Sequence, residues 1–360
     1  MKNIKNKLIL GTLILLSYCS LAFGQSANSN VILIDQAGNS LNLTIDQAGY
    51  GNKVGSLNNG VGNAYLNGAT NTVSLQQRGN NNVVGIWTSG SDQSLDGDIE
   101  GDNNKLFLDN HGNYGELKAE ITGDDNYAWL EQGGSNLHTN NEIQLWQAGD
   151  DHYAYLEVFT GTNNSIDVYM GNGQDDNYVY VLTGSDSDSN NIKVWQGKHS
   201  DGTTDADEVG GHEAYWIVNG DSNTLASYQT DTNRSGGGGD SHHLANYIDG
   251  DSNDVEHTQM GKAGHDGFVD ITGNNNTVDL YQRGNGGKKW ADVVLNGDGH
   301  TVDVNQRGSN YASADIDLTY GSGAYNLNLT QNVTTQTGTY SITGVCYNAG
   351  GCNITVNGSN

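Results

Sequence analysis

The feature that most constrains this chain is a phrase that recurs along it: Asn, two apolar residues at alternate positions, Gln, and usually Gly two residues later. The clearest copies are Asn71–Gly79 and Asn276–Gly284, and a third that begins at His300 keeps the frame. Because the period inside the phrase is two, each copy is predicted to be a β-strand with one apolar face; a helix would spread these residues around its circumference. Other copies end at Gln36, Gln147, Gln196, Gln229 and Gln259, and looser copies end at Gln47, Asn110, Gln132, Met170 and Gln331.

A second, weaker strand lies between successive copies and ends in Gly, as in Tyr178–Gly184 and Phe268–Gly273. A turn rich in Asp and Asn follows, such as Gly220–Asn223, and these residue types tolerate the positive φ of tight turns. The unit is therefore strand, Gly turn, strand, Gly-Asp-Asn turn, and from Gln259 onward it repeats every 23 to 25 residues. Longer spacings elsewhere are predicted to come from polar loops that leave the strand frame intact, such as Lys198–Gly211 and Asp231–Ser241.

One such unit cannot bury its apolar face alone, so neighbouring units must stack and bring equivalent residues over one another. Stacking explains why Asn and Gln face inward. A singly buried amide leaves a donor or acceptor unpaired at a cost of about 1–3 kcal/mol, whereas amides in register can bond to the same amide above and below. The predicted ladder residues are Asn71, Gln77, Asn141, Gln147, Asn190, Gln196, Asn223, Gln229, Asn253, Gln259, Asn276, Gln282, Gln306 and Gln331.

The predicted fold is therefore all-β: a β-solenoid of roughly a dozen degenerate two-strand turns, stacked as in cross-β, amyloid-type assemblies. The chain contains no Pro in 360 residues. Soluble proteins use Pro to block pairing at sheet edges, so this chain lacks one of the usual protections against edge-to-edge growth.

The first 24 residues are predicted to be a secretory signal peptide. Its features are, in order, the positive Lys2, Lys5 and Lys7, the apolar Leu8–Leu16, and a cleavage motif at Ala22–Gly24. No later segment approaches the roughly 20 apolar residues of a membrane-spanning helix. Residues 25–333 are assigned to the repeats. Residues 334–360 leave the repeat frame and are predicted to cap or dock one end of the solenoid.

Cys346 and Cys352 are the only cysteines beyond the predicted leader. An exported compartment is oxidising, and their close spacing suits a small disulfide loop. A disulfide or two free thiols are favoured over a metal site, because no further ligands lie nearby. Whether the pair is oxidised stays open.

The chain is strongly acidic. Its formal net charge is −27, and loss of the three leader lysines would make it more negative still. Nucleic acid and anionic membranes are therefore not expected as partners, because binding phosphate requires the opposite sign.

No catalytic, cofactor-binding or metal-binding residue is predicted. The Gly-Asp-x-Asn turns could bind Ca²⁺ through oxygen ligands, but turn geometry also accounts for them, and the question stays open. The ten His residues match no metal or catalytic pattern and are interpreted as loop residues. With 42 acidic residues, chance carboxylate pairs are inevitable, so a glycan-cleaving enzyme is not indicated.

Several aromatic residues occupy outward positions of the predicted strands. Stacked on adjacent turns, they would form rows able to hold sugars or a neighbouring filament. They could equally be strand formers that pack across strands, and the sequence favours neither interpretation. These residues are Trp146, Tyr153, Tyr155, Tyr178, Tyr180 and Trp195.

The spacing Asn/Ser-x5-Gln-x-Gly, followed by a Gly-Asn turn and a second short strand, resembles the curlin repeat of curli fibre subunits. The resemblance extends from Asn30 to about Gln331. It implies a bacterial cell-surface fibre in biofilm and adhesion, secreted as an unfolded chain through an outer-membrane pore. It also implies that curlin ladder positions correspond to Asn71 and Gln77, and to their equivalents in the other copies.

These observations predict a secreted structural subunit of a curli-like amyloid fibre that self-assembles by end-to-end stacking of solenoids. The expected partners are further copies of the chain, a nucleator subunit and the secretion pore. The alternative is a monomeric acidic β-helix adhesin or glycan-binding surface protein, with cation dependence left open. An enzyme is the least favoured class. The surface contacted, the major or minor subunit role and the solenoid handedness are not predicted.

Overall fold

The computed structural model describes residues 30–32, 34–55, 64–133, 141–171, 177–196, 213–229, 241–260, 264–283, 289–308, 311–319, 325–333, 338–344 and 352–359. The predicted signal peptide, Cys346 and the predicted loop Lys198–Gly211 lie outside these residues. So does the predicted loop Asp231–Ser241, apart from its last residue. Within the described ranges the chain forms twenty-four strands and no helix.

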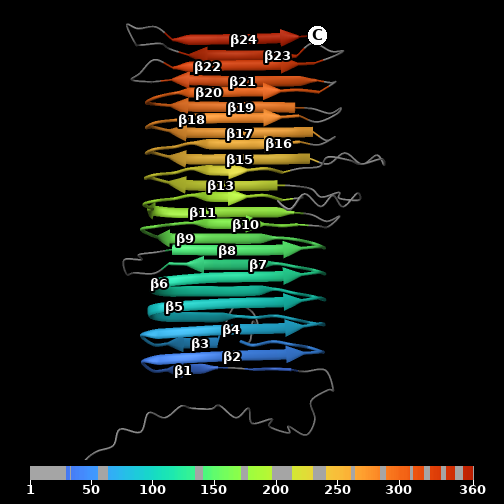
Figure 1. Cartoon of the computed structure of the whole chain (residues 1–360), viewed down its shortest axis with the longest axis vertical. Coiled ribbons are helices and arrows are strands. Elements are labelled where there is room, and N and C mark those ends of the chain that lie inside the picture. Colours follow the sequence, from blue (N-terminus) through green and yellow to red (C-terminus); the bar gives the residue numbers. More distant parts are fainter. Residues whose placement is uncertain are drawn as a thin grey trace, which may run out of the picture.

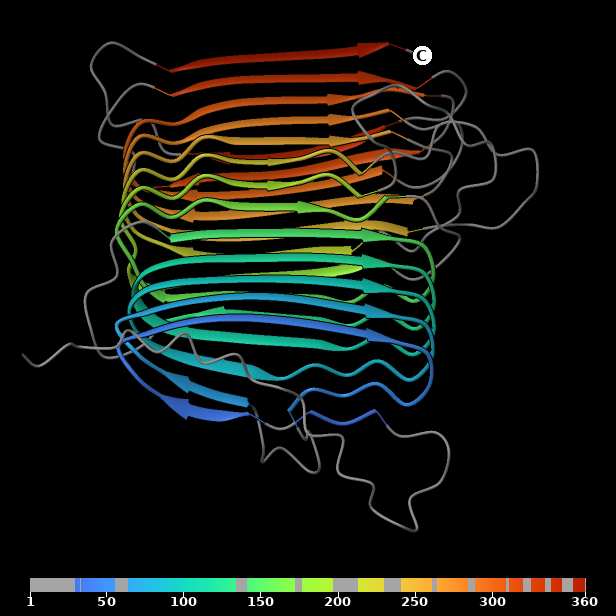
Figure 2. The same ribbon diagram turned by 60° about the horizontal axis from the view of Figure 1, so that its bottom comes forward.

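The strands wind around two faces of a single column (Figures 1 and 2). The first face contains β1 (Asp35–Ala37), β3 (Ala64–Asn67), β7 (Ala128–Gln132), β9 (Ala154–Thr160), β11 (Tyr178–Asp186), β13 (Glu213–Asn219), β15 (Ser241–Asp249), β17 (Gly264–Thr272), β19 (Lys289–Asn296), β21 (Ala312–Thr319) and β23 (Thr339–Gly344). The second face contains β2 (Ser40–Ala48), β4 (Thr70–Arg78), β8 (Asn141–Ala148), β10 (Ile166–Tyr169), β12 (Ile192–Val194), β14 (Leu225–Ser227), β16 (Val255–Gln259), β18 (Thr277–Gln282), β20 (Thr301–Gln306), β22 (Asn326–Asn332) and β24 (Asn353–Ser359). The two long strands β5 (Ile86–Glu100) and β6 (Leu106–Thr122) bend around the edge and belong to both faces.

Each strand pairs in parallel with the strand one coil before or after it. Among the described residues, the pairings place thirteen strand levels on each face. The register follows the repeated phrase: Val278 pairs with Val302 and Gln282 with Gln306. The predicted all-β solenoid of stacked two-strand turns is confirmed.

The core is one continuous column between the two faces. Side chains alternate between core and solvent along each strand, as in β18, where Val278, Leu280 and Gln282 are buried. The apolar positions of successive coils lie over one another and form a single cluster that extends from Ile45 to Leu329. This arrangement buries what no single coil could bury alone.

Tight turns connect the second strand of each unit to the next phrase. In these turns Gly and the residue after it both have positive φ, for example Gly123 (76°) and Asp124 (64°), or Gly273 (85°) and Asn274 (75°). Two successive left-handed residues are characteristic of a type I′ turn, which Gly, Asn and Asp adopt most readily. The predicted role of the Gly-Asp-Asn turns therefore agrees with the backbone.

The C-terminal segment departs from the expectation that it leaves the repeat frame. Strands β23 and β24 pair in register with β21 and β22, so they form a further coil at that end. The signature was not visible because its polar positions are replaced: Gly358 pairs with Gln331, and Cys352 precedes the strand where the phrase has Asn. Alternation alone, with Ile354 opposite Leu327, is enough to preserve the register.

Candidate functional site

An asparagine ladder follows the edge of the second face where its strands begin. From Asn141 on β8 to the start of β18, each later Asn donates from Nδ2 to Oδ1 of the Asn one coil earlier, at 2.5 to 2.9 Å. The members are Asn141, Asn164, Asn190, Asn223, Asn253 and Asn276, and all are buried. At the far end, Nδ1 of His300 lies 2.6 Å from Oδ1 of Asn276, so the imidazole replaces the next amide.

The same asparagines close the tight turns. Nδ2 of Asn223 also donates to the carbonyl of Gly220 (3.0 Å), and Asn253 and Asn276 do the same to Gly250 (2.9 Å) and Gly273 (2.8 Å). The two Nδ2 hydrogens can therefore serve the turn and the ladder at once. This double role explains why Asn, whose amide lies close to its own backbone, occupies this position.

A glutamine ladder runs along the opposite edge of the second face. Nε2 of Gln196 donates to Oε1 of Gln229 (2.7 Å), and the pattern continues to Gln259 (2.9 Å), Gln282 (3.0 Å) and Gln306 (3.4 Å). Nε2 of two members also reaches the next first-face strand, since Gln259 donates to the carbonyl of Asp266 and Gln282 to that of Trp290. Gln306, the last member, and Gln331, one coil later, donate to the carbonyls of Ser313 and Thr339. These amides join both faces at the corner.

The glutamine ladder is interrupted. Gln77 donates to Gln47 (2.8 Å), but Ile99 and Ile121 occupy the next two levels. Where an amide run meets an apolar residue, its outer acceptor has nothing to bind. Among the described residues, the buried Oε1 atoms of Gln77, Gln147 and Gln196 have no hydrogen-bond partner. The column therefore contains separate amide runs divided by apolar levels.

Four of the predicted ladder residues have other surroundings. Gln331 donates to the carbonyl of Thr339 (3.1 Å) and has no bond to Gln306 in the described part of the chain. Asn71 donates to Oε1 of Gln93 (2.7 Å) rather than to an Asn. Gln147 donates only to the carbonyl of Tyr153 (3.4 Å) among the described residues. Asn141 ends its ladder, because Gly115 occupies the level before it and Nδ2 of Asn141 has no partner in the described part of the chain.

A second asparagine ladder, at the edge where first-face strands begin, was not predicted. Nδ2 of Asn104 donates to Asn82 (2.9 Å), and Asn126 donates to Asn104 (2.6 Å). Further along, Asn177 bonds to Nδ1 of the buried His152 (2.8 Å). The available signal was the 22-residue spacing of Asn82, Asn104 and Asn126, each three residues after a turn Gly.

The last coil leaves core positions uncovered. Tyr340 and Ile354 pair with the buried Ala314 and Leu327, yet they are 56% and 49% exposed. Among the described residues, β23 and β24 each pair with only one strand. Figure 1 shows them at one end of the column, with β1 at the other. At that other end, Leu41 and Leu43 are only partly buried.

Aromatic rows cover part of the first face. Tyr153 and Tyr178 stack with centroids 5.1 Å apart and nearly parallel planes, and Tyr155 and Tyr180 do so at 5.0 Å. The rows extend over neighbouring coils through Phe107, Trp129, Tyr215, Tyr247 and Phe268, and through Tyr127. The predicted stacking of these tyrosines is present, and their cross-strand packing is a sufficient structural role.

The second face has an aromatic row of its own beside a hollow of about 460 Å³. Rings of Trp146 and Tyr169 lie 4.5 Å apart, and Trp195 borders the same hollow. Its polar wall includes Asp96, Lys118, Gln144 and Asp167. Burial raises the pKa of Asp96 and of Asp167, while nearby Lys118 and Lys193 respectively oppose the shift. Ring faces next to carboxylate and amide acceptors are the groups that bind sugar hydroxyls and C–H faces.

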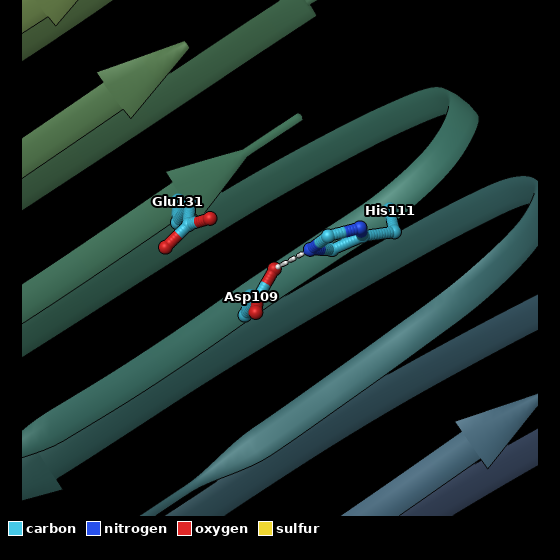
Figure 3. A group of neighbouring side chains, drawn as sticks. All are labelled: Asp109, His111 and Glu131. Atoms are coloured by element: carbon cyan, nitrogen blue, oxygen red, sulfur yellow. Dashed lines mark ion pairs between the residues drawn. The ribbon is translucent and has the colours of Figure 1, made fainter. Parts of the chain in front are cut away.

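One group of side chains has the composition of a metal site. Asp109 and His111 lie two residues apart on β6, and Glu131 pairs with Asp109 from β7, so all three point outward from the same face (Figure 3). Their ligand atoms lie within 4.8 Å of one another, and Nε2 of His111 is 2.9 Å from Oδ1 of Asp109. This group was not predicted from the sequence. Its signal was Asp-x-His with Glu one 22-residue coil later.

The fold and the ladders define a parallel β-solenoid repeat protein with amide ladders along its edges. Residues 273–308 match the family model of the curlin associated repeat, which supports the resemblance inferred from the sequence. The matched segment contains the turn at Gly273, β18, β19 and β20. Comparison with curated proteins finds no match, and comparison with solved structures finds none either. No helix in the described residues is long and apolar enough to cross a membrane.

Proposed function

We propose that this protein is a structural subunit of an extracellular, curli-like amyloid fibre, and that it assembles by end-to-end stacking of solenoids. The fibre would belong to the biofilm matrix or mediate cell-surface adhesion. Growth would be head to tail, so that every junction joins the last coil of one copy to the first coil of the next. Such a heterologous contact does not close and gives a filament.

The open C-terminal end carries this proposal. Tyr340 and Ile354 expose apolar surface at core positions, and a strand edge beside them is unpaired within the described residues. A further coil in register would cover both. The curlin repeat, the predicted export signal and the absence of Pro from the chain support the same function.

One substitution can block the edge while preserving the coil. Asn353 donates its N–H to the carbonyl of Tyr325 in the preceding coil. Because N–H directions alternate along a strand, the N–H of Val356 points to the open side. Val356→Pro therefore removes a donor needed for growth without removing an internal hydrogen bond, and edge strands tolerate Pro at such positions.

The test is filament formation by residues 25–360 after dilution from denaturant, followed by electron microscopy and fibre diffraction. The parent and the control Val356→Ala are expected to form filaments with a reflection near 4.8 Å. Val356→Pro is expected to stay a β-rich monomer by circular dichroism. Filaments of equal yield from Val356→Pro would refute stacking through this end, and a soluble parent would refute fibre formation.

The hollow on the second face favours a second candidate function, binding of a neutral glycan. Trp146 is 37% exposed there, and Gln144 and Asp167 offer hydrogen-bond acceptors beside its ring. The acidic surroundings would repel anionic polysaccharides. This activity fits a monomeric adhesin, and it is also compatible with a fibre that displays the hollow once per subunit.

A further inference from the structure

We propose that Asp109, His111 and Glu131 form a binding site for a divalent transition-metal ion, of which Zn²⁺ is the best-suited example. The site lies on the outer surface of the first face, away from both ends and on the opposite face from the hollow beside Trp146. It goes beyond the proposed fibre function and does not depend on it.

The ligand set suits zinc. One imidazole nitrogen and two carboxylates are ligands that Zn²⁺ takes at about 2.0–2.2 Å, and three protein ligands leave a fourth tetrahedral position for water. The three ligand atoms lie within 4.8 Å of one another. Small side-chain rotations would bring them to the roughly 3.3 Å separation that a tetrahedral ion of this bond length requires. Ca²⁺ is less suited, because it prefers six to eight oxygen ligands.

The repeat brings two carboxylates together on paired strands, and one of them is nearly shielded from water. Asp109 is only 8% exposed, and within the described residues its Oδ1 has Nε2 of His111 as an ion-pair partner at 2.9 Å. Two neighbouring carboxylates with a single imidazole beside them are costly to bury, and a bound divalent ion would offset that cost.

The backbone holds the three ligands in place before any ion arrives. Asp109 and Glu131 are directly paired in neighbouring strands, and His111 is on the same side of β6 as Asp109. The ring of Trp87, one coil earlier, lies 5.0 Å from the imidazole of His111 and limits its rotation. Ligands on paired strands are more rigid than ligands on loops, which favours binding.

The same row of the first face supplies a matched control. Asp270 occupies the register position of Asp109 several coils later, on the same outer row. Its paired neighbours are Tyr247 and Val294, so it has the surface position and charge of Asp109 without the other two ligands. An effect of generic surface acidity would appear in an Asp270 variant as well.

The experiment is calorimetric titration of Zn²⁺ into the chelator-treated, folded full-length mature chain, together with Co²⁺ absorption spectra. One equivalent of Zn²⁺ is expected to bind, and Co²⁺ is expected to give the intense visible bands of a four-coordinate site. Asp109→Asn, His111→Gln and Glu131→Gln are each expected to weaken binding at least tenfold, whereas Asp270→Asn leaves it unchanged. Circular dichroism checks that each variant keeps the solenoid.

Three outcomes would overturn the proposal. They are no saturable Zn²⁺ binding by the parent, equal binding by the three ligand variants, and equal weakening by Asp270→Asn. Filament formation is scored separately on the same proteins. Loss of metal binding with normal filaments, or the reverse, would distinguish a failure of this proposal from a failure of the proposed function.

Discussion

Gln259 lies in the middle of the longest glutamine run, and its replacement by Leu measures what the ladder contributes. The substitution would leave two buried side-chain groups without their ladder partners: Nε2 of Gln229 and Oε1 of Gln282. Each such group costs about 1–3 kcal/mol, and burial of the added apolar surface offsets a part of that cost. The expected loss in free energy of unfolding is roughly 1–4 kcal/mol.

The informative comparison is with the triple variant Gln229→Leu, Gln259→Leu and Gln282→Leu. Groups that bond only to one another are removed together, so groups without their ladder partner remain only at the ends of the run. These are Nε2 of Gln196 and Oε1 of Gln306. The three single variants together leave about three times as many such groups, so the triple variant is expected to lose about a third of the sum of the single losses.

The assay is guanidinium unfolding in the Val356→Pro background, which is expected to stay monomeric. Thr258→Leu serves as the control, because Thr258 lies on the outward side of β16, next to Gln259. It is expected to change the free energy of unfolding by less than about 0.5 kcal/mol. Losses in the triple variant that equal the sum of the single losses would mean that the amides act independently, which would refute the ladder argument.

Three further predictions concern single positions. Both ring nitrogens of the buried His257 lack partners among the described residues, and burial, then nearby His265 and His243, lowers its pKa to about 3. The folded state therefore keeps His257 neutral, whereas in the unfolded state this histidine takes up a proton below its ordinary pKa. The free energy of unfolding is expected to fall by up to about 1.4 kcal/mol per pH unit from about pH 6.5 toward pH 3. His257→Leu should reduce this pH dependence in guanidinium unfolding at pH 7 and pH 4.5, and an unchanged dependence would contradict the prediction. Gly123→Ala places a Cβ on a residue with φ of 76° and should lower the free energy of unfolding by about 1–2 kcal/mol. Gly38→Ala is the control, because φ is not positive there and no atom lies within 4 Å of the added Cβ. Equal melting temperatures for the two variants would refute the turn assignment. Trp146→Ala should abolish the retardation of the protein by neutral glycans in affinity electrophoresis. Tyr281→Ala is the control, because Tyr281 lies on the outward side of β18 in the same face, and it should leave the retardation unchanged. Equal retardation of both variants would exclude the hollow as the glycan site.

Local pattern was enough to predict the strands and their faces. In Asn276–Gly284 the alternation places Val278, Leu280 and Gln282 on one side, and these are the residues that the structure buries. The turn residues were equally readable, since Gly273 and Asn274 adopt the positive φ that their types tolerate. These properties depend on neighbours in the chain, so they are visible in a single sequence.

Contacts between coils were harder to predict from the sequence. The spacing between stacked residues varies, from 22 residues between Asn82 and Asn104 to 33 between Asn190 and Asn223. Insertions of different lengths hide which residue lies over which. For this reason the break at Ile99, the second asparagine ladder and the last coil at β24 were not predicted.

By itself, the sequence determined that this protein is a β-solenoid with inward amides, because period-two alternation and turn chemistry are local properties of the chain. Only the tertiary structure decided where the ladders are continuous, which core positions stay open at the end, and that Asp109, His111 and Glu131 meet. Those outcomes depend on register between coils, and register is set by the summed burial of whole strands rather than by any single residue.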